Sequence, residues 1–235
     1  MKLMNLLCLQ HVEFEGPAAI YEWANSRGHG LEILRMNSGG TMPALKEWDG
    51  LIVLGGPMSV HDESTIPWMH IEKDFLRQAV SAGKRVLGIC LGAQLLAEVL
   101  GGEVRRAPSR EIGWFPITWT KEALRSPLVA GFPPTILAFH WHGEMFSIPK
   151  DAVALASSAA CPHQGFWYPP HVLALQFHLE ATTESIRSLL HHCPHDLVAG
   201  PWCQTADEME AGLHYCEIAN SYLFALLDRF FAKNH

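Results

Sequence analysis

Residues 86–94 read Val86-Leu87-Gly88-Ile89-Cys90-Leu91-Gly92-Ala93-Gln94. The run before the cysteine has the composition of a buried strand, and the run after it has the apolar spacing of a helix. The glycines two residues to either side allow a tight strand-to-helix turn that holds the cysteine in a strained, accessible pose. The helix dipole then favours the thiolate. The stretch predicts a nucleophilic Cys90 rather than a buried structural cysteine, which is the common alternative.

Residues 173–180, Leu-Ala-Leu-Gln-Phe-His-Leu-Glu, supply the base that a thiolate nucleophile needs. His178 and Glu180 are two residues apart at the end of a predicted strand, so extended backbone directs both side chains to the same side. Glu180 can then fix the tautomer and the orientation of His178. A histidine taken alone is more often structural, but the strand end and the nearby carboxylate favour a catalytic role here.

Residues 51–58, Leu-Ile-Val-Leu-Gly-Gly-Pro-Met, place two glycines directly after another apolar run. Glycines at such a point can present backbone N–H groups to a developing negative oxygen, and Pro57 stiffens the turn. A plain turn is the alternative. In combination with Cys90, the pattern predicts an oxyanion hole made by the N–H groups of Gly56 and Leu91.

Short apolar runs alternate with helical patterns over the first hundred residues, which predicts a parallel sheet covered on both faces. The expected strands are 3–9, 31–36, 51–54 and 85–89, and the expected helices are 17–26, 67–82 and 91–100. Strand-like runs follow at 114–120, 135–140, 153–156 and 172–177, and a terminal helix is expected over 215–232. Without repeats or linkers, the sequence predicts one α/β domain over residues 1–235.

Composition narrows the function classes. The 235 residues are 49% hydrophobic and 17% charged, which excludes a disordered chain. The net charge is −7, and the densest basic stretch, 105–110, holds three arginines, so we expect a solvated loop there and no nucleic-acid partner. The six cysteines contain no CxxC pair, which favours a reducing compartment. We recognise no signal peptide and no apolar run long enough for a membrane span, so we expect a cytoplasmic protein.

Three motifs, in this order and spacing, resemble the class I (triad) glutamine amidotransferases over about residues 3–190. They are Gly-Gly-Pro at 55–57, Gly-x-Cys-x-Gly-x-Gln at 88–94 and Gln-Phe-His-x-Glu at 176–180. The resemblance is strongest to the glutaminase domain of GMP synthase and its stand-alone relatives. It implies a flavodoxin-like three-layer α/β/α sandwich with a central, mostly parallel sheet. Residues 195–235 then form a C-terminal helical extension without recognisable chemistry.

The resemblance also implies roles for individual residues. Cys90 attacks the carboxamide carbon of a γ-glutamyl substrate, His178 protonates the leaving group and then activates water, and Glu180 orients His178. Substrate contacts are implied at Gln94 and Gly55, at Glu111, Ile112 and Gly113 in a segment like the family's Arg-Glu-x-Gly, and at His142 in a loop like its His-Gly-Asp. Leu179 departs from the family, which usually has proline there.

Other groups are assigned no chemistry. His140 and His142 flank Trp141, and residues 191–195 read His-His-Cys-Pro-His, but neither set has a second half at metal-ligand spacing, so we expect no metal and no other cofactor. The aromatic run Phe166-Trp167-Tyr168 is interpreted as packing or a partner surface. Glu111 and Glu144 are taken as structural or substrate-adjacent rather than as an acid/base pair.

The predicted function is hydrolysis of the γ-carboxamide of glutamine, or of a γ-glutamyl compound, through a Cys90 thioester that releases ammonia or an amine. About 45 residues beyond the motif region are too few for a synthase domain. Two options then remain, a glutaminase that delivers ammonia to a separate synthase subunit and a free-standing enzyme, and the free-standing enzyme is slightly preferred. A non-catalytic regulatory protein, or a cysteine hydrolase or chaperone of related fold, is the further alternative. The acceptor and the oligomeric state cannot be predicted.

Overall fold

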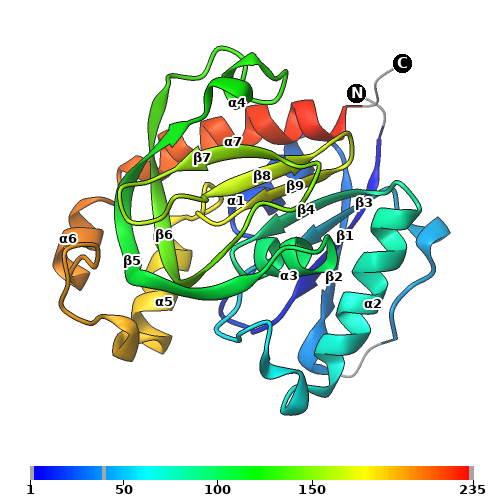
Figure 1. The fold of residues 1–235 in the computed structure, drawn as a ribbon, viewed down its shortest axis with the longest axis horizontal. Coiled ribbons are helices and arrows are strands. Elements are labelled where there is room, and N and C mark those ends of the chain that lie inside the picture. The colour runs from blue at the N-terminus through cyan, green and yellow to red at the C-terminus, as the bar shows by residue number, and fades with distance from the viewer. Residues whose placement is uncertain (1–2, 39–40, 233–235) are drawn as a thin grey trace.

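The computed structural model describes residues 3–38 and 41–232. Its strands are β1 (Asn5–Gln10), β2 (Gly30–Arg35), β3 (Gly50–Val53), β4 (Arg85–Ile89), β5 (Val104–Trp119), β6 (Thr135–Phe146), β7 (Val153–Ser157), β8 (Gly165–Tyr168) and β9 (Val172–Leu175). Within the described residues they form one nine-stranded sheet in the order β2-β1-β3-β4-β9-β8-β7-β5-β6 (Figure 1). The predicted α/β fold is confirmed, and the sheet is mixed, with a parallel and an antiparallel half.

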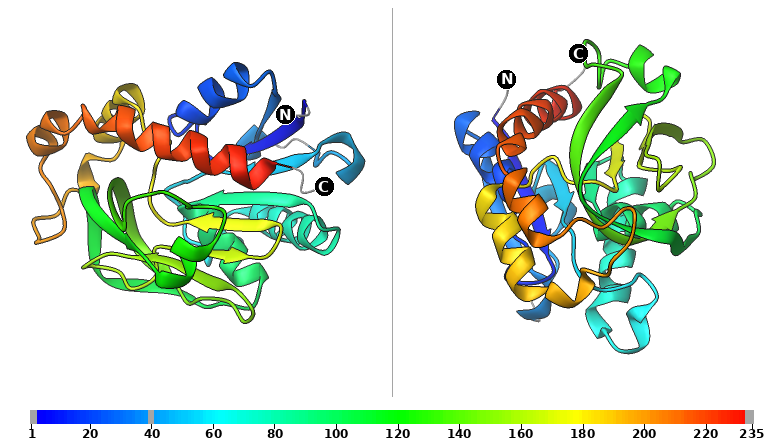
Figure 2. Two further views of the ribbon diagram at one scale, coloured as in Figure 1. Left: turned by 90° about the horizontal axis from the view of Figure 1, so that it is seen from above. Right: turned by 90° about the vertical axis from the view of Figure 1, so that its left-hand side faces the viewer.

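The parallel half runs from β2 through β1, β3 and β4 to β9. Apart from Arg85 at the start of β4, its central strands β3, β4 and β9 are apolar and buried, because helices cover both faces (Figure 2). The helices α1 (Ala19–Ser26), α5 (Thr183–His192) and α7 (Tyr215–Phe231) pack with one hydrophobic core, and α2 (Pro67–Ser81) and α3 (Leu91–Val99) pack with the other. The predicted strands and helices of this half all form, with ends shifted by a few residues.

The antiparallel half is dominated by a long hairpin of β5 and β6. Both strands extend well beyond their predicted limits. The prediction of a loop at residues 105–110 is wrong, because these residues belong to β5, but the arginines at 105, 106 and 110 are exposed as expected. The pairing with β6 shifts register between Arg106 and Glu111, so the stretch around Pro108 is an irregularity inside the hairpin. Long-range pairing between strands thus overrides the local signal of three arginines.

Several short elements lie outside the predicted set. The aromatic run Phe166-Trp167-Tyr168 lies in β8, between β7 and β9, and Phe166 is fully buried, so the run is packing. Helices α5 and α6 (Ala206–Ala211) begin at capping boxes formed by Thr182 with Ser185 and by Thr205 with Glu208. A shorter helix, α4 (Lys121–Arg125), follows β5. The Thr-x-x-Glu pattern at residues 205–208 is a sequence signal that could have marked α6, whereas the serine at position 185 gives α5 no such signal.

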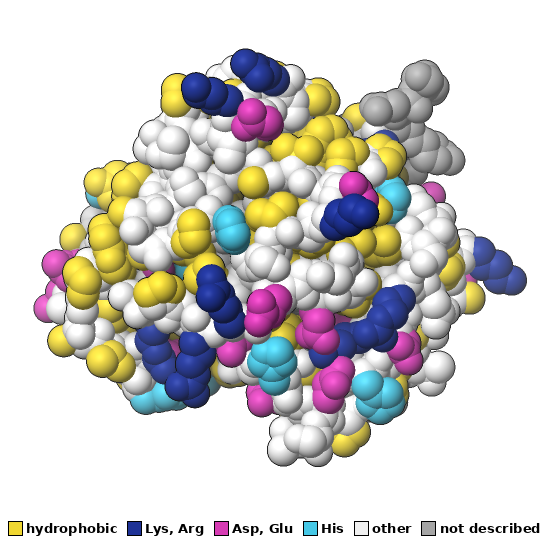
Figure 3. Space-filling view, in the orientation of Figure 1, with side chains coloured by type: hydrophobic (Ala, Val, Ile, Leu, Met, Phe, Trp, Pro, Cys, Tyr) yellow, Lys and Arg dark blue, Asp and Glu magenta, His cyan; other side chains and the backbone are white. Residues whose placement is uncertain are grey.

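Charged side chains of both signs, with several histidines, are interspersed over the lower half of the face in Figure 3. Among the described residues, no helix combines the length and the apolar character that crossing a bilayer requires.

Candidate active site

Cys90 occupies the turn between β4 and α3 that the flanking glycines predict. Its backbone has a φ of 51° and a ψ of −107°, a strained conformation for a residue with a side chain. A Cβ atom at Gly88 would lie 2.5 Å from the carbonyl oxygen of Gly92, and one at Gly92 would collide with the carbonyl of Val53. Only glycine fits at either position, so the turn is specified by the sequence around the cysteine.

The Cys90 side chain is 7% exposed and opens onto a cleft. Its backbone N–H donates to the carbonyl of Leu175 at 2.8 Å, which ties the turn to β9, and its Sγ lies 3.7 Å from the carbonyl oxygen of Trp141. The thiol therefore sits at the N-terminal end of α3, where the helix dipole stabilises negative charge.

His178 and Glu180 form a buried pair beside this thiol. Nδ1 of His178 lies 2.5 Å from Oε1 of Glu180, which leaves Nε2 for Cys90. Burial alone would lower the pKa of His178, but the charge of Glu180 and the nearby Cys90 thiol outweigh it and raise the pKa well above its usual value. The arrangement matches that of a nucleophile, a proton carrier and an orienting carboxylate.

The loop that carries His178 is held by backbone hydrogen bonds. The N–H of His178 donates to the carbonyl of Phe139 at 2.8 Å, and the side-chain amide of Asn220 on α7 donates to the carbonyls of Leu179 and Ala181 at 2.7 and 3.0 Å. These contacts restrain the loop at the position where the family usually has proline.

The turn after β3 presents Gly56 to the same cleft. Leu91 is the first residue of α3, so its N–H has no acceptor within the helix. The carbonyl of Gly55 accepts a hydrogen bond of 2.8 Å from Nδ1 of His11, and Nε2 of that ring lies 2.9 Å from the buried carboxylate of Glu72. Because a trans peptide directs its C=O and N–H oppositely, this bond also orients the N–H of Gly56.

The cleft has a volume of about 570 Å³, within the range typical of small-molecule sites. Gln94 lines it and donates to Oε1 of Gln176 at 3.1 Å. Glu144 lines it as well and accepts from the hydroxyl of Ser59 at 3.0 Å, so it is not paired with Glu111. The cleft wall thus combines amide, hydroxyl and charged groups.

The other predicted substrate residues are distributed unevenly. Ile112 and His142 line the cleft, whereas Glu111 and Gly113 do not, and Gly55 lines a smaller neighbouring cavity with His178 and Glu180. The ring of His142 is nearly buried and faces Glu111 rather than the opening. Gly113, with a φ of 117°, packs against the side chain of Gln204, which also accepts from the N–H of Trp114. The lack of a side chain at position 113 therefore allows the C-terminal segment to pack against β5.

Several cleft residues were missed by the sequence analysis. Arg110 of β5 pairs with Asp196 at 2.6 Å, and the indole N–H of Trp141 donates to the same carboxylate at 3.0 Å. Glu15, which follows β1, and Cys193, at the end of α5, also line the cleft. Asp196 lies in the segment that was assigned no chemistry, and it reaches the cleft only because the chain after α5 folds back against the hairpin.

Among the described residues, one group has three ligand atoms close enough for a metal ion: Glu111, His140 and His142. Burial lowers the pKa of His140 to about 3. Burial alone would raise the pKa of Glu111, but its contacts with His142 and His140 outweigh it and lower the pKa, so the group is a carboxylate at neutral pH. Residues 191–195 are not part of this group.

The fold and this site define an α/β protein with a cysteine on a nucleophile elbow beside a histidine–carboxylate pair. The family model described as glutamine amidotransferase class-I matches residues 18–192, and the chain belongs to that family. It is 38% identical over 198 residues to the glutamine amidotransferase-like protein YfeJ of Salmonella typhimurium, covering 83% of each chain.

The chain is also 34% identical over 153 residues to a glutamine-hydrolyzing GMP synthase subunit of Sulfolobus acidocaldarius, covering 64% of this chain and 77% of that one. Of the full-length GMP synthases that it matches, it spans 24–28% of the length. The crystal structure of a glutamine amidotransferase from Methylobacillus flagellatus superposes with a TM-score of 0.90 at 29% identity, over 100% of this chain and 98% of that one.

Proposed function

We propose that this protein hydrolyses the γ-carboxamide of glutamine, or of a γ-glutamyl compound, through a thioester on Cys90. The observation that carries the proposal is that the strained Cys90 turn and the turn at Gly56 line one cleft, while the His178–Glu180 pair lines the adjoining smaller cavity. A Cβ atom at Gly55 would lie 3.5 Å from both the Cys90 Cβ and the His178 ring, so the two side chains are neighbours across this turn. Family membership supports chemistry on glutamine in general, and the GMP synthase relatives add to that support.

In the proposed reaction, Sγ of Cys90 attacks the γ-carbonyl carbon, and the N–H groups of Gly56 and Leu91 stabilise the resulting oxyanion. His178 gives its proton to the leaving nitrogen, the C–N bond breaks, and ammonia or an amine departs from the thioester. His178 then takes a proton from water as the water attacks the thioester carbon. The C–S bond breaks and the carboxylate product leaves.

The cleft favours a γ-glutamyl substrate with an extended leaving group as well as glutamine, because free glutamine would fill only part of the 570 Å³. Its lining carries both signs of charge, with Arg106 and Arg110 on the hairpin and Glu15 and Asp196 on other segments of the chain. An α-amino acid head group carries both signs as well, so this lining supports a zwitterionic substrate.

The experiment follows glutamate release from glutamine and from a series of γ-glutamyl amides, with Cys90→Ser as the matched control. We expect hydrolysis of at least one substrate and its loss in Cys90→Ser. Full activity in the control would overturn the mechanism. If all substrates stay intact, a γ-diazoketone analogue of glutamine provides the second arm: an adduct on Cys90 supports a glutamine site, and the absence of both adduct and hydrolysis refutes the proposal.

A second candidate function is a glutaminase subunit that delivers ammonia to a separate synthase. The GMP synthase relative from Sulfolobus acidocaldarius favours it, because that relative is named as one subunit of its enzyme and is similar in length to this chain. An adduct on Cys90 without hydrolysis in the isolated chain supports this candidate, whereas rapid hydrolysis supports the free-standing enzyme. A single domain over residues 1–235 and a reducing compartment such as the cytoplasm, which suits the free thiols, complete the proposal.

A further inference from the structure

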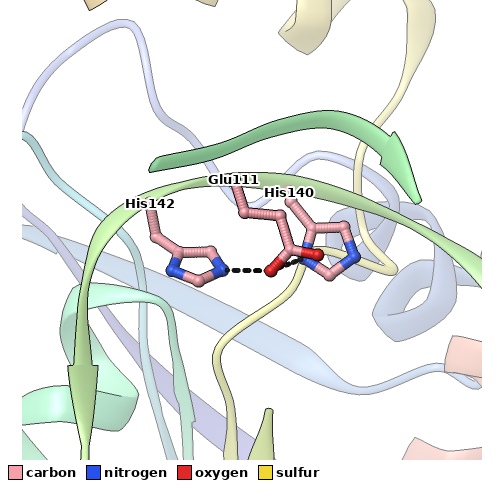
Figure 4. A group of neighbouring side chains, drawn as sticks. All are labelled: Glu111, His140 and His142. Atoms are coloured by element: carbon pink, nitrogen blue, oxygen red, sulfur yellow. Dashed lines mark ion pairs between the residues drawn. The ribbon is translucent and has the colours of Figure 1, made fainter. Parts of the chain in front are cut away.

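A buried carboxylate and two histidine rings face one another on the β5–β6 hairpin, beside but outside the proposed chemistry (Figure 4). Glu111 lies directly opposite His142 in the antiparallel register, and His140 is two residues before His142. All three side chains therefore share one face of the hairpin. The residues are each no more than 5% exposed, and their ligand atoms lie within 4.8 Å of one another.

In each ring, one nitrogen points away from Glu111 to a backbone carbonyl. This contact determines the tautomer of the ring, and so whether the nitrogen that faces Glu111 carries a lone pair. Nε2 of His140 lies 3.3 Å from the carbonyl oxygen of Phe115, and Nδ1 of His142 lies 3.0 Å from that of Glu144. A carbonyl oxygen only accepts, so these nitrogens carry the protons. In neutral rings, Nδ1 of His140 and Nε2 of His142 are then acceptors directed at a carboxylate, which is itself an acceptor.

Three acceptors that converge in a buried space repel one another unless a cation lies between them. In the described part of the chain, Nδ1 of His140, Nε2 of His142 and Oε1 of Glu111 have no hydrogen-bond partner. Ser158 and Gln164 donate to Oε2 of Glu111, at 3.0 and 2.6 Å, and so orient the carboxylate. Outer hydrogen bonds to carbonyls and oriented carboxylates are the usual support of metal ligands.

We propose that Glu111, His140 and His142 bind a divalent transition-metal ion of the zinc class. Two histidines and one glutamate are a zinc ligand set, and ligands about 2.1 Å from a tetrahedral ion lie about 3.4 Å from each other. Oε2 of Glu111 lies 3.2 Å from Nε2 of His142 and 3.6 Å from Nδ1 of His140. Water can supply a fourth ligand.

The ion would tie β5 to β6 at the level where the hairpin forms the cleft wall. Arg110 and Ile112 flank Glu111, and Trp141 and Gly143 flank His142, and all four line the cleft. In the sequence, His140 and His142 were assigned no metal because no second half stood at ligand spacing. The hairpin register supplies it, since Glu111 is 29 residues from His140 in the chain but opposite His142 in the sheet.

The test measures metal content and affinity, not turnover. The full chain carrying Cys90→Ser, so that the cleft thiol cannot ligate, is stripped with a chelator, loaded with Zn²⁺ or Co²⁺ and gel-filtered. We expect one ion per chain, a visible Co²⁺ spectrum without a thiolate charge-transfer band, and a higher Tm with Zn²⁺. Adding Glu111→Gln or His142→Gln should weaken Zn²⁺ binding by more than about 100-fold, beyond the cost of losing an outer hydrogen-bond partner.

The matched control is His163→Gln, which removes a histidine whose Nδ1 also bonds a backbone carbonyl but which stands outside the group. This variant should bind Zn²⁺ with unchanged affinity. No retained metal in the Cys90→Ser chain, or equal affinity in Glu111→Gln, would show that only protons and hydrogen bonds hold the group together. A thiolate band in the Co²⁺ spectrum would likewise overturn the assignment. The spectrum of the Cys90→Ser chain decides even where a ligand variant fails to fold.

Discussion

The two walls of the cleft are built in different ways. On the parallel side, Gly56 and Cys90 follow the ends of β3 and β4, and His178, which lines the adjoining smaller cavity, follows the end of β9. Short turns between consecutive elements therefore position all three residues. On the hairpin side, Arg110, Trp141 and Asp196 come from separate parts of the chain and meet only through long-range pairing. The proposed reacting groups thus depend on local turns, and the other groups that line the cleft depend on the tertiary fold.

If the residues of the parallel wall carry out the reaction, Glu180→Gln should cause the largest loss of kcat apart from substitution of Cys90 itself. The amide can keep the position of Glu180 but does not stabilise a protonated His178, and it permits the wrong tautomer. We expect kcat to fall roughly 10³- to 10⁴-fold in a steady-state assay of glutamate release. Glu184→Gln, at the first turn of α5, is the control and should keep kcat. A loss of less than tenfold would contradict the role of Glu180.

The same variant should change the pH profile. Because the pKa of His178 is raised, the protonated ring persists to higher pH than in a free histidine, and proton donation is lost as pH rises through that value. The basic limb of kcat/KM should therefore lie well above pH 6.5 in the parent. Removing the charge of Glu180 should move that limb to lower pH. If the basic limb of kcat/KM stays in place in Glu180→Gln, a group other than His178 is responsible for it.

His11→Gln tests whether a residue behind the parallel wall positions the Gly56 N–H. His11 touches no reacting group and acts as a positioning residue, because its hydrogen bond to the Gly55 carbonyl orients the N–H of Gly56. Losing one oxyanion donor costs about 10²- to 10³-fold, so disorienting it should lower kcat roughly 10- to 100-fold with little change in KM. His29→Gln removes another buried histidine, one that packs on Trp23, and serves as the control. Equal losses of kcat in both variants would indicate a merely structural role.

The contrast between the walls also explains what the sequence could predict. The elbow at Cys90 is specified within nine residues, since Gly88 and Gly92 are sterically required, and the strand end that places His178 is equally local. Arg110 stands in a basic, proline-containing stretch that by itself indicates a loop, and its place in β5 depends on the pairing of Arg106 and Glu111 on either side with β6. Glu111 was assigned to the substrate, but the hairpin turns it toward His140 and His142. Asp196 has no local signal, since its position depends on how the chain leaves α5.

Arg110→Ala tests the hairpin wall. If this wall binds the parts of the substrate that do not react, the variant should raise KM roughly 3- to 10-fold and leave kcat within about twofold. Arg187→Ala is the matched control, because Arg187 forms a similar exposed pair with Glu210, outside the residues that line the cleft. It should change neither constant. A fall in kcat at constant KM would place Arg110 in the chemical step and remove the distinction between the walls.

The smallest expected effect on kcat comes from substituting Asn220, because α7 supports the parallel wall without lining the cleft. Asn220 on α7 donates to the carbonyls of Leu179 and Ala181, so Asn220→Ala leaves two partly buried acceptors unpaired at a cost of about 1–3 kcal/mol. We expect Tm to fall by several degrees and kcat to fall about two- to fivefold, because the loop of His178 is loosened but not displaced. Ser221→Ala, the adjacent exposed residue whose hydroxyl bonds only within α7, should leave both unchanged. A large loss of kcat in Asn220→Ala would show that the local turn does not suffice to position His178, and that the chemistry depends on the tertiary fold as much as the hairpin wall does.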